Sequence, residues 1–134
     1  MPPTLLDTNA VSDLMGGHPN LKVRVAQAKG ILVTSVIVRG EILYGLERLP
    51  HEKKRTDLEV QAQFVLSSLP CEVITERIAE IYGSLKASLQ GQGLILKDND
   101  LWIAATALAL GATLVTRDQG FTHIPGLVVE DWTL

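Results

Sequence analysis

The sequence predicts an α/β protein whose central sheet is parallel and covered by helices on both faces. Short runs rich in β-branched residues alternate along the chain with stretches of helical periodicity, a pattern typical of parallel sheets with crossover helices. The chain has 134 residues, of which 46% are hydrophobic and 20% charged, as expected for a folded protein with one well-buried core. We therefore expect one domain over residues 1–134, with three α/β/α layers and a central parallel sheet of four to five strands.

The first half of the chain is expected to contribute two strands and two helices to this arrangement. A short apolar run ends at Asp7 and predicts the first strand, and "ILVTS" (31–35) predicts the second. Ser35 can cap the helix that follows, and Pro50 stops that helix. A second helix is predicted over 53–69, where one helical face carries Leu58, Ala62, Val65 and Leu69.

The next segment predicts a third strand and two more helices. "CEVIT" (71–75) is the strand, and Thr75 can cap a helix that ends near Gly91. The buried face of that helix is expected to hold Ile78, Ile81, Leu85 and Leu89. "NDLWIAATALALG" (99–111) is apolar nearly all round, which predicts a buried helix that ends at its final glycine.

Acidic residues follow the predicted strands or begin the predicted helices. "ATLVT" (112–116) predicts a fourth strand, and "LVVE" (127–130) predicts a fifth at the edge of the sheet. Asp7 follows the first strand, Asp118 follows the fourth, and Asp100 lies in the first turn of the buried helix. Since active sites of open parallel sheets lie beyond the carboxyl ends of the strands, these acids are candidates for one site.

Each of these acids also has an ordinary explanation. Asp7 can be a helix cap, Asp100 can complement a helix dipole, and Asp118 can be a turn residue. Glu41 is harder to explain in this way, because none of its helical neighbours is basic: these are Ile37, Val38, Tyr44 and Gly45. Burying several carboxylates together without a cation costs several kcal/mol or neutralises them, and a divalent ion removes that cost.

The chemistry of the candidate ligands favours Mg²⁺ or Mn²⁺, which prefer oxygen ligands. Zinc is disfavoured, since the only cysteine is Cys71 and the three histidines, His18, His51 and His123, are isolated. The chain also has no Gly-x-Ser-x-Gly motif for a serine hydrolase.

Four segments, taken in order, resemble the PIN-domain ribonucleases, and more closely the VapC-type toxins of bacterial toxin–antitoxin pairs. They are "LLDTNAVSDL", "TSVIVRGEILYGLERL", "NDLWIAATALALGATLVTRD" and "IPGLVVEDW". The resemblance implies a PIN-like fold, RNA cleavage with Mg²⁺ or Mn²⁺, a homodimer, and an antitoxin whose C-terminal segment enters a groove. The acidic cluster of the family matches Asp7, Glu41, Asp100 and Asp118, with supporting positions at Asn9, Thr116 and Asp98.

The chain departs from the family pattern at two places. Arg39 and Gly40 precede the helix glutamate where small or aliphatic residues are more common, and Asp98 is an extra acid that can be a cap or a spare ligand. Arg39, Lys86 and Lys97 are candidates for phosphate contacts, although solvated surface charge is the favoured explanation for each of them. The same holds for "HEKKR" (51–55), which we interpret as the start of a helix.

Three rival classes of protein have weaker support in the sequence. "DTNAV" resembles the nucleophile motif of haloacid-dehalogenase phosphatases, except that Asn9 replaces its second aspartate. A receiver domain needs an Asp after the third strand, and "CEVIT" is followed by none. The third class is a PIN-like partner-binding protein without catalysis.

The amino-acid composition limits which binding partners and which cellular compartment are expected for this protein. A net charge of −3 argues against a protein that coats nucleic acid through bulk charge. A single cysteine and the absence of a signal-peptide pattern predict a cytoplasmic protein, and no apolar stretch is long enough to predict a membrane span. Asp13 and Asp57 are expected to be solvated helix acids.

Overall fold

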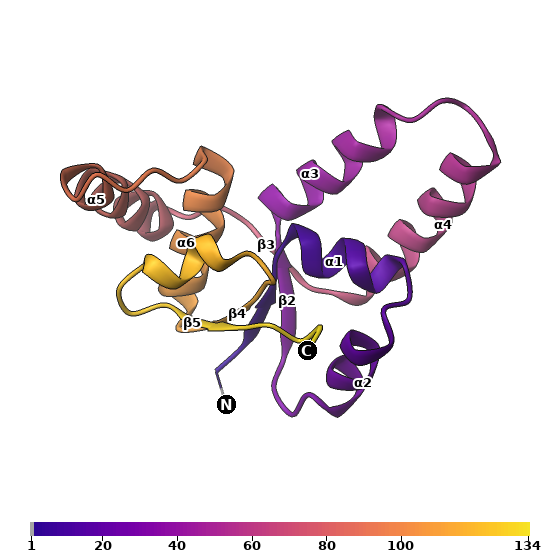
Figure 1. Cartoon of the computed structure of the whole chain (residues 1–134), viewed down its shortest axis with the longest axis horizontal. Helices are drawn as coiled ribbons and strands as arrows, with labels where there is room; N and C mark the ends of the chain where they lie inside the picture. The colour runs from indigo at the N-terminus through magenta and orange to yellow at the C-terminus, as the bar shows by residue number, and fades with distance from the viewer. Residues whose placement is uncertain (1) are drawn as a thin grey trace.

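A five-stranded parallel sheet lies at the centre of the fold, with helices on both of its faces (Figure 1). A computed structural model describes residues 2–134, so only Met1 of the predicted domain lies outside the described residues. The strands are β1 (Thr4–Leu6), β2 (Leu32–Ser35), β3 (Cys71–Glu72), β4 (Thr113–Val115) and β5 (Val128–Glu130). The helices are α1 (Thr8–Met15), α2 (Pro19–Gln27), α3 (Val36–Glu47), α4 (Lys53–Ser68), α5 (Glu76–Gly91) and α6 (Asp98–Leu110), with a 3-10 helix η1 (Gln119–His123). The predicted three-layer class is confirmed.

The strand order is β3-β2-β1-β4-β5, so β1 lies between β2 and β4 in the sheet. The chain moves outward from β1 to β3, with α1 to α4 on one side, and then returns past β1 to β4, with α5 and α6 on the other side (Figure 1). The direction of winding therefore reverses between β1 and β4, and ligands of open α/β sheets bind at such a reversal. The backbone N–H of Asp7 donates to the carbonyl of Val115 at 3.2 Å, so the exits of these two strands are adjacent.

Capping residues fix several helix ends where the sequence predicts them. The hydroxyl of Ser35 accepts a hydrogen bond from the backbone of Val38, and that of Thr75 accepts one from Ile78, each at 3.2 Å. Gly111 ends α6 with a φ of +62°, a left-handed conformation that glycine adopts without steric cost.

The predicted helical faces supply much of the core. On α4, Ala62, Val65 and Leu69 are buried and Leu58 is partly buried. Helix α6 is buried along most of its length, and its buried residues are Leu101, Ile103, Ala104, Ala105, Thr106 and Ala107. Between residues 2 and 134, no helix combines the length and apolarity that crossing a membrane requires.

Two parts of the fold differ from the sequence prediction. Strand β3 has only two residues instead of the five of "CEVIT", because it is an edge strand that pairs only with Thr34 and Ser35. Val73, beyond its end, is 61% exposed. Helix α2 was not anticipated: it begins after His18, whose ring nitrogen accepts from the backbone of Leu21, and it buries only Leu21.

Candidate active site

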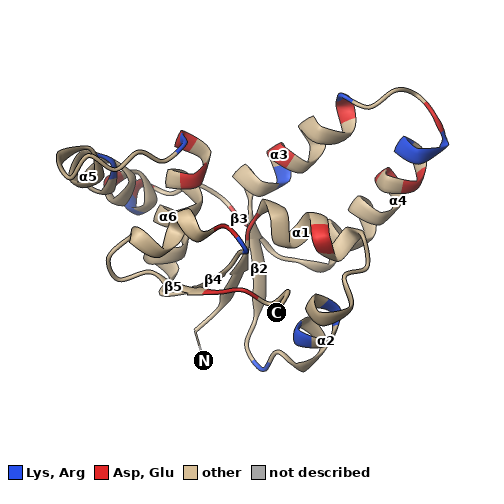
Figure 2. Ribbon diagram, viewed as in Figure 1, with Lys and Arg blue, Asp and Glu red and all other residues tan. Residues whose placement is uncertain are grey.

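Four carboxylates from separate elements line one pocket at the carboxyl end of the sheet. Asp7 follows β1, Glu41 lies in α3, Asp100 lies in the first turn of α6, and Asp118 follows β4. The pocket has a volume of about 300 Å³, and its other lining residues are Thr8, Asn9, Ser12, Ile103 and Arg117. Figure 2 shows acidic segments on α3, at the start of α6 and beyond the strand ends, around one end of the sheet. The structure brings together all four acids that the sequence singles out.

Asp7 is both a helix cap and a member of this pocket. Its side chain is buried, and Oδ1 accepts a hydrogen bond from the backbone of Ala10 at 2.9 Å, which caps α1. The pKa of Asp7 is raised to about 6: burial raises it most and the charges of Asp100 and Asp118 add to the rise, whereas hydrogen bonds from Thr116 and Ala10 lower it. Asp7 therefore caps α1 and lines the pocket at the same time.

Asp100 and Asp118 are more exposed than Asp7 and act on each other. Burial raises the pKa of Asp100, and the charges of Asp118 and Glu41 add to this rise, whereas Lys97 opposes it. Asp118 is exposed, and its Oδ1 accepts from the backbone of Gly120 at 2.9 Å at the start of η1. The expected turn role of Asp118 is therefore observed together with its place in the pocket.

Glu41 is held by a hydroxyl group. The Thr8 side chain donates a hydrogen bond to Oε1 of Glu41, and both residues are partly buried. Thr8 was not predicted as a site residue, although it directly follows Asp7 at the strand exit. This bond fixes the carboxylate of α3 against the start of α1.

Asn9 and Thr116 connect the start of α1 to the exit of β4. Asn9 donates from Nδ2 to Oγ1 of Thr116 and accepts at Oδ1 from the backbone of Arg117, each at 3.3 Å. Oγ1 of Thr116 also accepts from the backbone of Asp118 at 3.0 Å. Both supporting residues thus lie beside the acids, where their hydrogen bonds fix the loop that carries Asp118.

Asp98, the third expected supporting residue, lies outside the pocket. Its Oδ1 accepts hydrogen bonds from Lys86 Nζ and from the Tyr82 hydroxyl, each at 2.9 Å. The N-cap position of α6 belongs to Lys97, so Asp98 does not cap this helix. Tyr82 stacks on Trp102 with ring centroids 3.8 Å apart, and the interactions of Asp98 therefore join α5 to α6.

The candidate phosphate-binding residues differ in their exposure to solvent and in their ion-pair partners. Arg39 is exposed, whereas Lys86 is engaged by Asp98. Arg55 of the "HEKKR" segment is buried, donates to the Leu49 carbonyl at 3.1 Å and lies 3.4 Å from carboxylate oxygens of two glutamates, Glu47 and Glu59. The interpretation of this segment as a helix start is confirmed, since α4 begins at Lys53.

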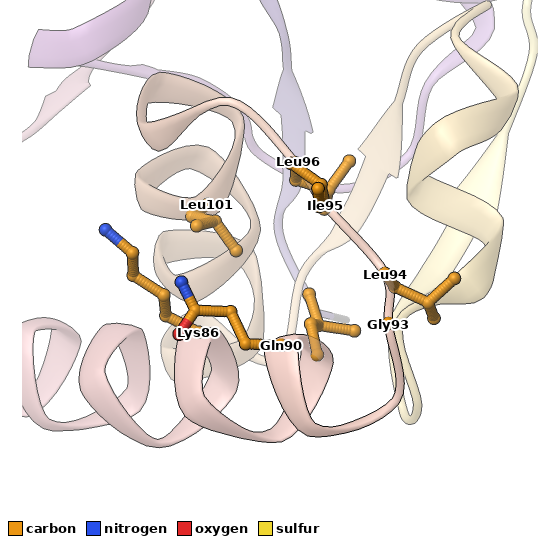
Figure 3. A pocket seen from close by; sticks show the side chains of 8 residues that line it. Lys86, Gln90, Gly93, Leu94, Ile95, Leu96 and Leu101 are labelled. Atoms are coloured by element: carbon orange, nitrogen blue, oxygen red, sulfur yellow. The ribbon is translucent and has the colours of Figure 1, made fainter.

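A second hollow, of about 300 Å³, lies between α5, the following loop and α6 (Figure 3). Its lining is mainly aliphatic, and it includes Leu89, Leu94, Ile95, Leu96 and Leu101. None of the four acids lines this hollow. The charged pocket at the sheet end is therefore the better candidate for chemistry.

The chain matches known proteins along nearly its whole length. The family model described as "PIN domain" matches residues 4–127. Ribonuclease VapC2 of Rickettsia felis is 33% identical over 134 residues, which cover 96% of both proteins. The structure of VapBC-1 from nontypeable Haemophilus influenzae aligns with a TM-score of 0.86 and 30% identity, over 98% of this chain and 99% of that one. A toxin–antitoxin complex from Klebsiella pneumoniae aligns with a TM-score of 0.74 and 28% identity, over 96% and 97% of the two chains. The chain belongs to the PIN-domain family and, within it, to the VapC-type ribonuclease toxins of VapBC toxin–antitoxin systems.

Proposed function

We propose that this chain is a Mg²⁺- or Mn²⁺-dependent endoribonuclease whose active site consists of Asp7, Glu41, Asp100 and Asp118. One observation carries the proposal: these four carboxylates, from elements far apart in sequence, line a single pocket at the reversal of strand order. Membership of the VapC family supplies the class of reaction, which is hydrolysis of RNA phosphodiester bonds.

The residues of the pocket suit a hard divalent cation. All four candidates are oxygen donors, and the pKa values of Asp7 and Asp100 are raised by burial and by neighbouring carboxylates, a repulsion that a bound cation relieves. Within residues 2–134, no three His, Cys, Asp or Glu side chains are close enough to hold one ion together. The all-oxygen donor set fits Mg²⁺ or Mn²⁺, and Mg²⁺ commonly binds through one or two carboxylates and keeps several waters. Asp7 and Asp100 are the proposed direct ligands.

The remaining residues of the pocket have roles that follow from their hydrogen bonds. A bound Mg²⁺ or Mn²⁺ supplies a lowered pKa for water and stabilises charge on phosphate oxygens. Glu41, fixed by Thr8, and Asp118, fixed by its turn, would orient the attacking water and accept its proton.

The observed contacts of Asn9 do not support the alternative of a haloacid-dehalogenase phosphatase. Asn9, which replaces the second aspartate of that motif, is engaged with Thr116 and the backbone of Arg117. An inactive partner-binding protein remains a different hypothesis, and the complete acidic set argues against it because catalysis is the simplest reason to keep four repelling carboxylates.

Cleavage of RNA by the purified protein tests this proposal. We expect a mixed RNA pool to be cut in the presence of Mn²⁺ or Mg²⁺ and to stay intact with EDTA, because the acids alone repel phosphate. Gel electrophoresis of the products measures the effect. Folded protein that leaves the pool intact with either metal would instead support the partner-binding hypothesis.

We infer that the cognate partner is an antitoxin, as in the VapBC-1 and Klebsiella complexes. A groove of about 330 Å³ supports this inference; it is lined by residues of α1, α2 and α4, including Leu14, Met15, Val25 and Phe64. Phe64 is 73% exposed, which is costly in water and favourable against an apolar segment of a partner.

We also propose a homodimer, which the resemblance to the VapC-type toxins implies and an exposed apolar surface on α3 supports. Three of the four residues on the predicted α4 face are buried within the chain itself, so that face is not free for association. The outer side of α3 still exposes Leu43 and Tyr44, at 44% and 63%. Sedimentation at tens of micromolar should show a dimer, and Tyr44→Glu should weaken it by placing a charge on this surface. A wild-type monomer at that concentration would reject the dimer.

A further inference from the structure

Arg117 is the one basic residue among those that line the acidic pocket. It lies between Thr116 and Asp118 at the exit of β4, and its side chain is 53% exposed. Its backbone N–H is held by Asn9, so the residue is anchored at the base of its side chain. Arg117 was not predicted as a site residue, because no sequence motif distinguishes it from a solvated surface arginine.

Asp13 of α1 holds the guanidinium in a defined orientation. Nε of Arg117 donates to Oδ2 of Asp13 at 2.9 Å, and Nη2 lies 3.5 Å from Oδ1. The side chain of Asp13 is only 21% exposed, so this pair is better shielded than a fully exposed surface ion pair. Asp13 is therefore an ion-pair partner of a pocket residue, which corrects its interpretation as a solvated acid.

The pair with Asp13 occupies only one edge of the guanidinium. A guanidinium has five N–H donors, and this pair uses Nε and one donor of Nη2. Within residues 2–134, the Nη1 donors have no protein acceptor within hydrogen-bond reach. The charges of Asp7 and Asp131 also act on Arg117, but only Asp13 is within ion-pair distance. The free edge is thus available to an anion that enters the pocket.

A phosphodiester is the anion that this arrangement suits. Four carboxylates repel the backbone of RNA, and a fixed cation on the pocket wall offsets part of that repulsion. A guanidinium can bind two phosphate oxygens at once, and a fixed donor stabilises charge without reorganisation. Resting on the proposed nuclease function, we propose that Arg117 binds a backbone phosphate of the RNA at or beside the scissile bond, and that Asp13 positions its guanidinium.

Kinetics of matched variants separate this role from a purely structural one. Arg117→Gln should lower kcat/KM for RNA cleavage about 10- to 100-fold, the effect of losing a charged hydrogen-bond pair. Asp13→Asn should lower it much less, because the asparagine oxygen can still accept the hydrogen bond from Nε and the cation remains in the pocket. Both variants remove the same ion pair and should shift the melting temperature similarly. Equal losses of kcat/KM in the two variants would show that Arg117 only forms a structural ion pair between α1 and the exit of β4, and would overturn the proposal.

Salt dependence of RNA binding gives a second test that does not require turnover. In an Asp100→Asn background, short single-stranded RNA is titrated against protein with and without Arg117→Gln. Loss of one phosphate contact should reduce the slope of log Kd against log salt by about 0.7. Arg77→Gln, a change at an exposed residue of α5 outside the pocket, is the matched control and should leave the slope unchanged. An unchanged slope in Arg117→Gln overturns the phosphate contact even if the wild type cleaves RNA. Wild type that cleaves no RNA instead rejects the nuclease function, and the slope still decides whether Arg117 binds phosphate.

Discussion

In metal-free buffer at pH 7.5, Asp7→Asn is expected to melt at a higher temperature than the wild type, by up to about 10 °C. The reason is the cost of keeping a buried carboxylate ionised beside other carboxylates. Folding raises the pKa of Asp7 from 3.8 to about 6, and each pKa unit corresponds to about 1.4 kcal/mol, so the ionised group costs up to about 3 kcal/mol. Asparagine removes the charge and can still accept the hydrogen bond from Ala10 that caps α1.

The pH dependence of this difference identifies its cause. Because the folded pKa is raised, the native protein holds a proton that the unfolded chain releases between about pH 4 and pH 6. The contribution of Asp7 to the free energy of unfolding therefore falls as pH rises through that window and is constant above it. Thermal melts should show the wild type and Asp7→Asn diverging from pH 4 to pH 7, with the variant more stable at the higher pH.

Added metal should reverse the order of stability. An ion that binds only the native state stabilises it by about 2.7 kcal/mol at a hundredfold excess over Kd. The wild type should gain this stability with Mg²⁺ or Mn²⁺, whereas Asp7→Asn should lose most of the gain. Asp57→Asn is the control, since Asp57 is exposed on α4 and outside the pocket. If Asp7→Asn melts lower at every pH and keeps the full metal response, Asp7 is only a helix cap.

The sequence could predict the four acids of the pocket because parallel strands deliver their carboxyl ends to one edge. Asp7 and Asp118 follow strands directly, and the absence of basic neighbours around Glu41 pointed to an unusual environment. It could not predict which strands are adjacent, because the reversal between β1 and β4 depends on which face each helix covers. Nor could it predict the role of Asp98, since only the observed hydrogen bonds from Tyr82 and Lys86 show that Asp98 binds α5 and is neither a cap nor part of the pocket lining.

The hydrogen bonds and ion pairs that hold the pocket residues in place could not be predicted from the sequence for a related reason. Thr8 and Glu41 are 33 positions apart, and Asp13 and Arg117 are 104 apart. Such pairs depend on the angles at which α1, α3 and the exit of β4 meet. Local propensity carries no information on those angles, and an isolated Asp on a helix therefore looks solvated even when a distant arginine binds it.

Replacing Asp100 is expected to give the largest loss of activity, and it tests whether the acids act as one site. Asp100→Asn keeps the shape of the side chain but removes a proposed metal ligand, so kcat/KM for RNA cleavage should fall by about a thousandfold. Asp7→Asn should lower kcat/KM by a comparable factor. The double variant should have a kcat/KM close to that of the less active single variant, because the effects of removing two ligands of one ion are not additive.

Overproduction of the wild type should arrest cell growth, and overproduction of Asp100→Asn should not.

Asp98→Asn is the matched control for this experiment. Asp98 lies in the same turn of α6, carries the same charge and is bound by Lys86 and Tyr82 outside the pocket. Its replacement should leave cleavage close to the wild-type rate, although it weakens the contact between α5 and α6. If Asp98→Asn loses as much activity as Asp100→Asn at equal stability, Asp98 is a ligand after all. If Asp7→Asn and Asp100→Asn lose activity additively, the two acids serve separate functions, because residues that share one metal lose that metal only once.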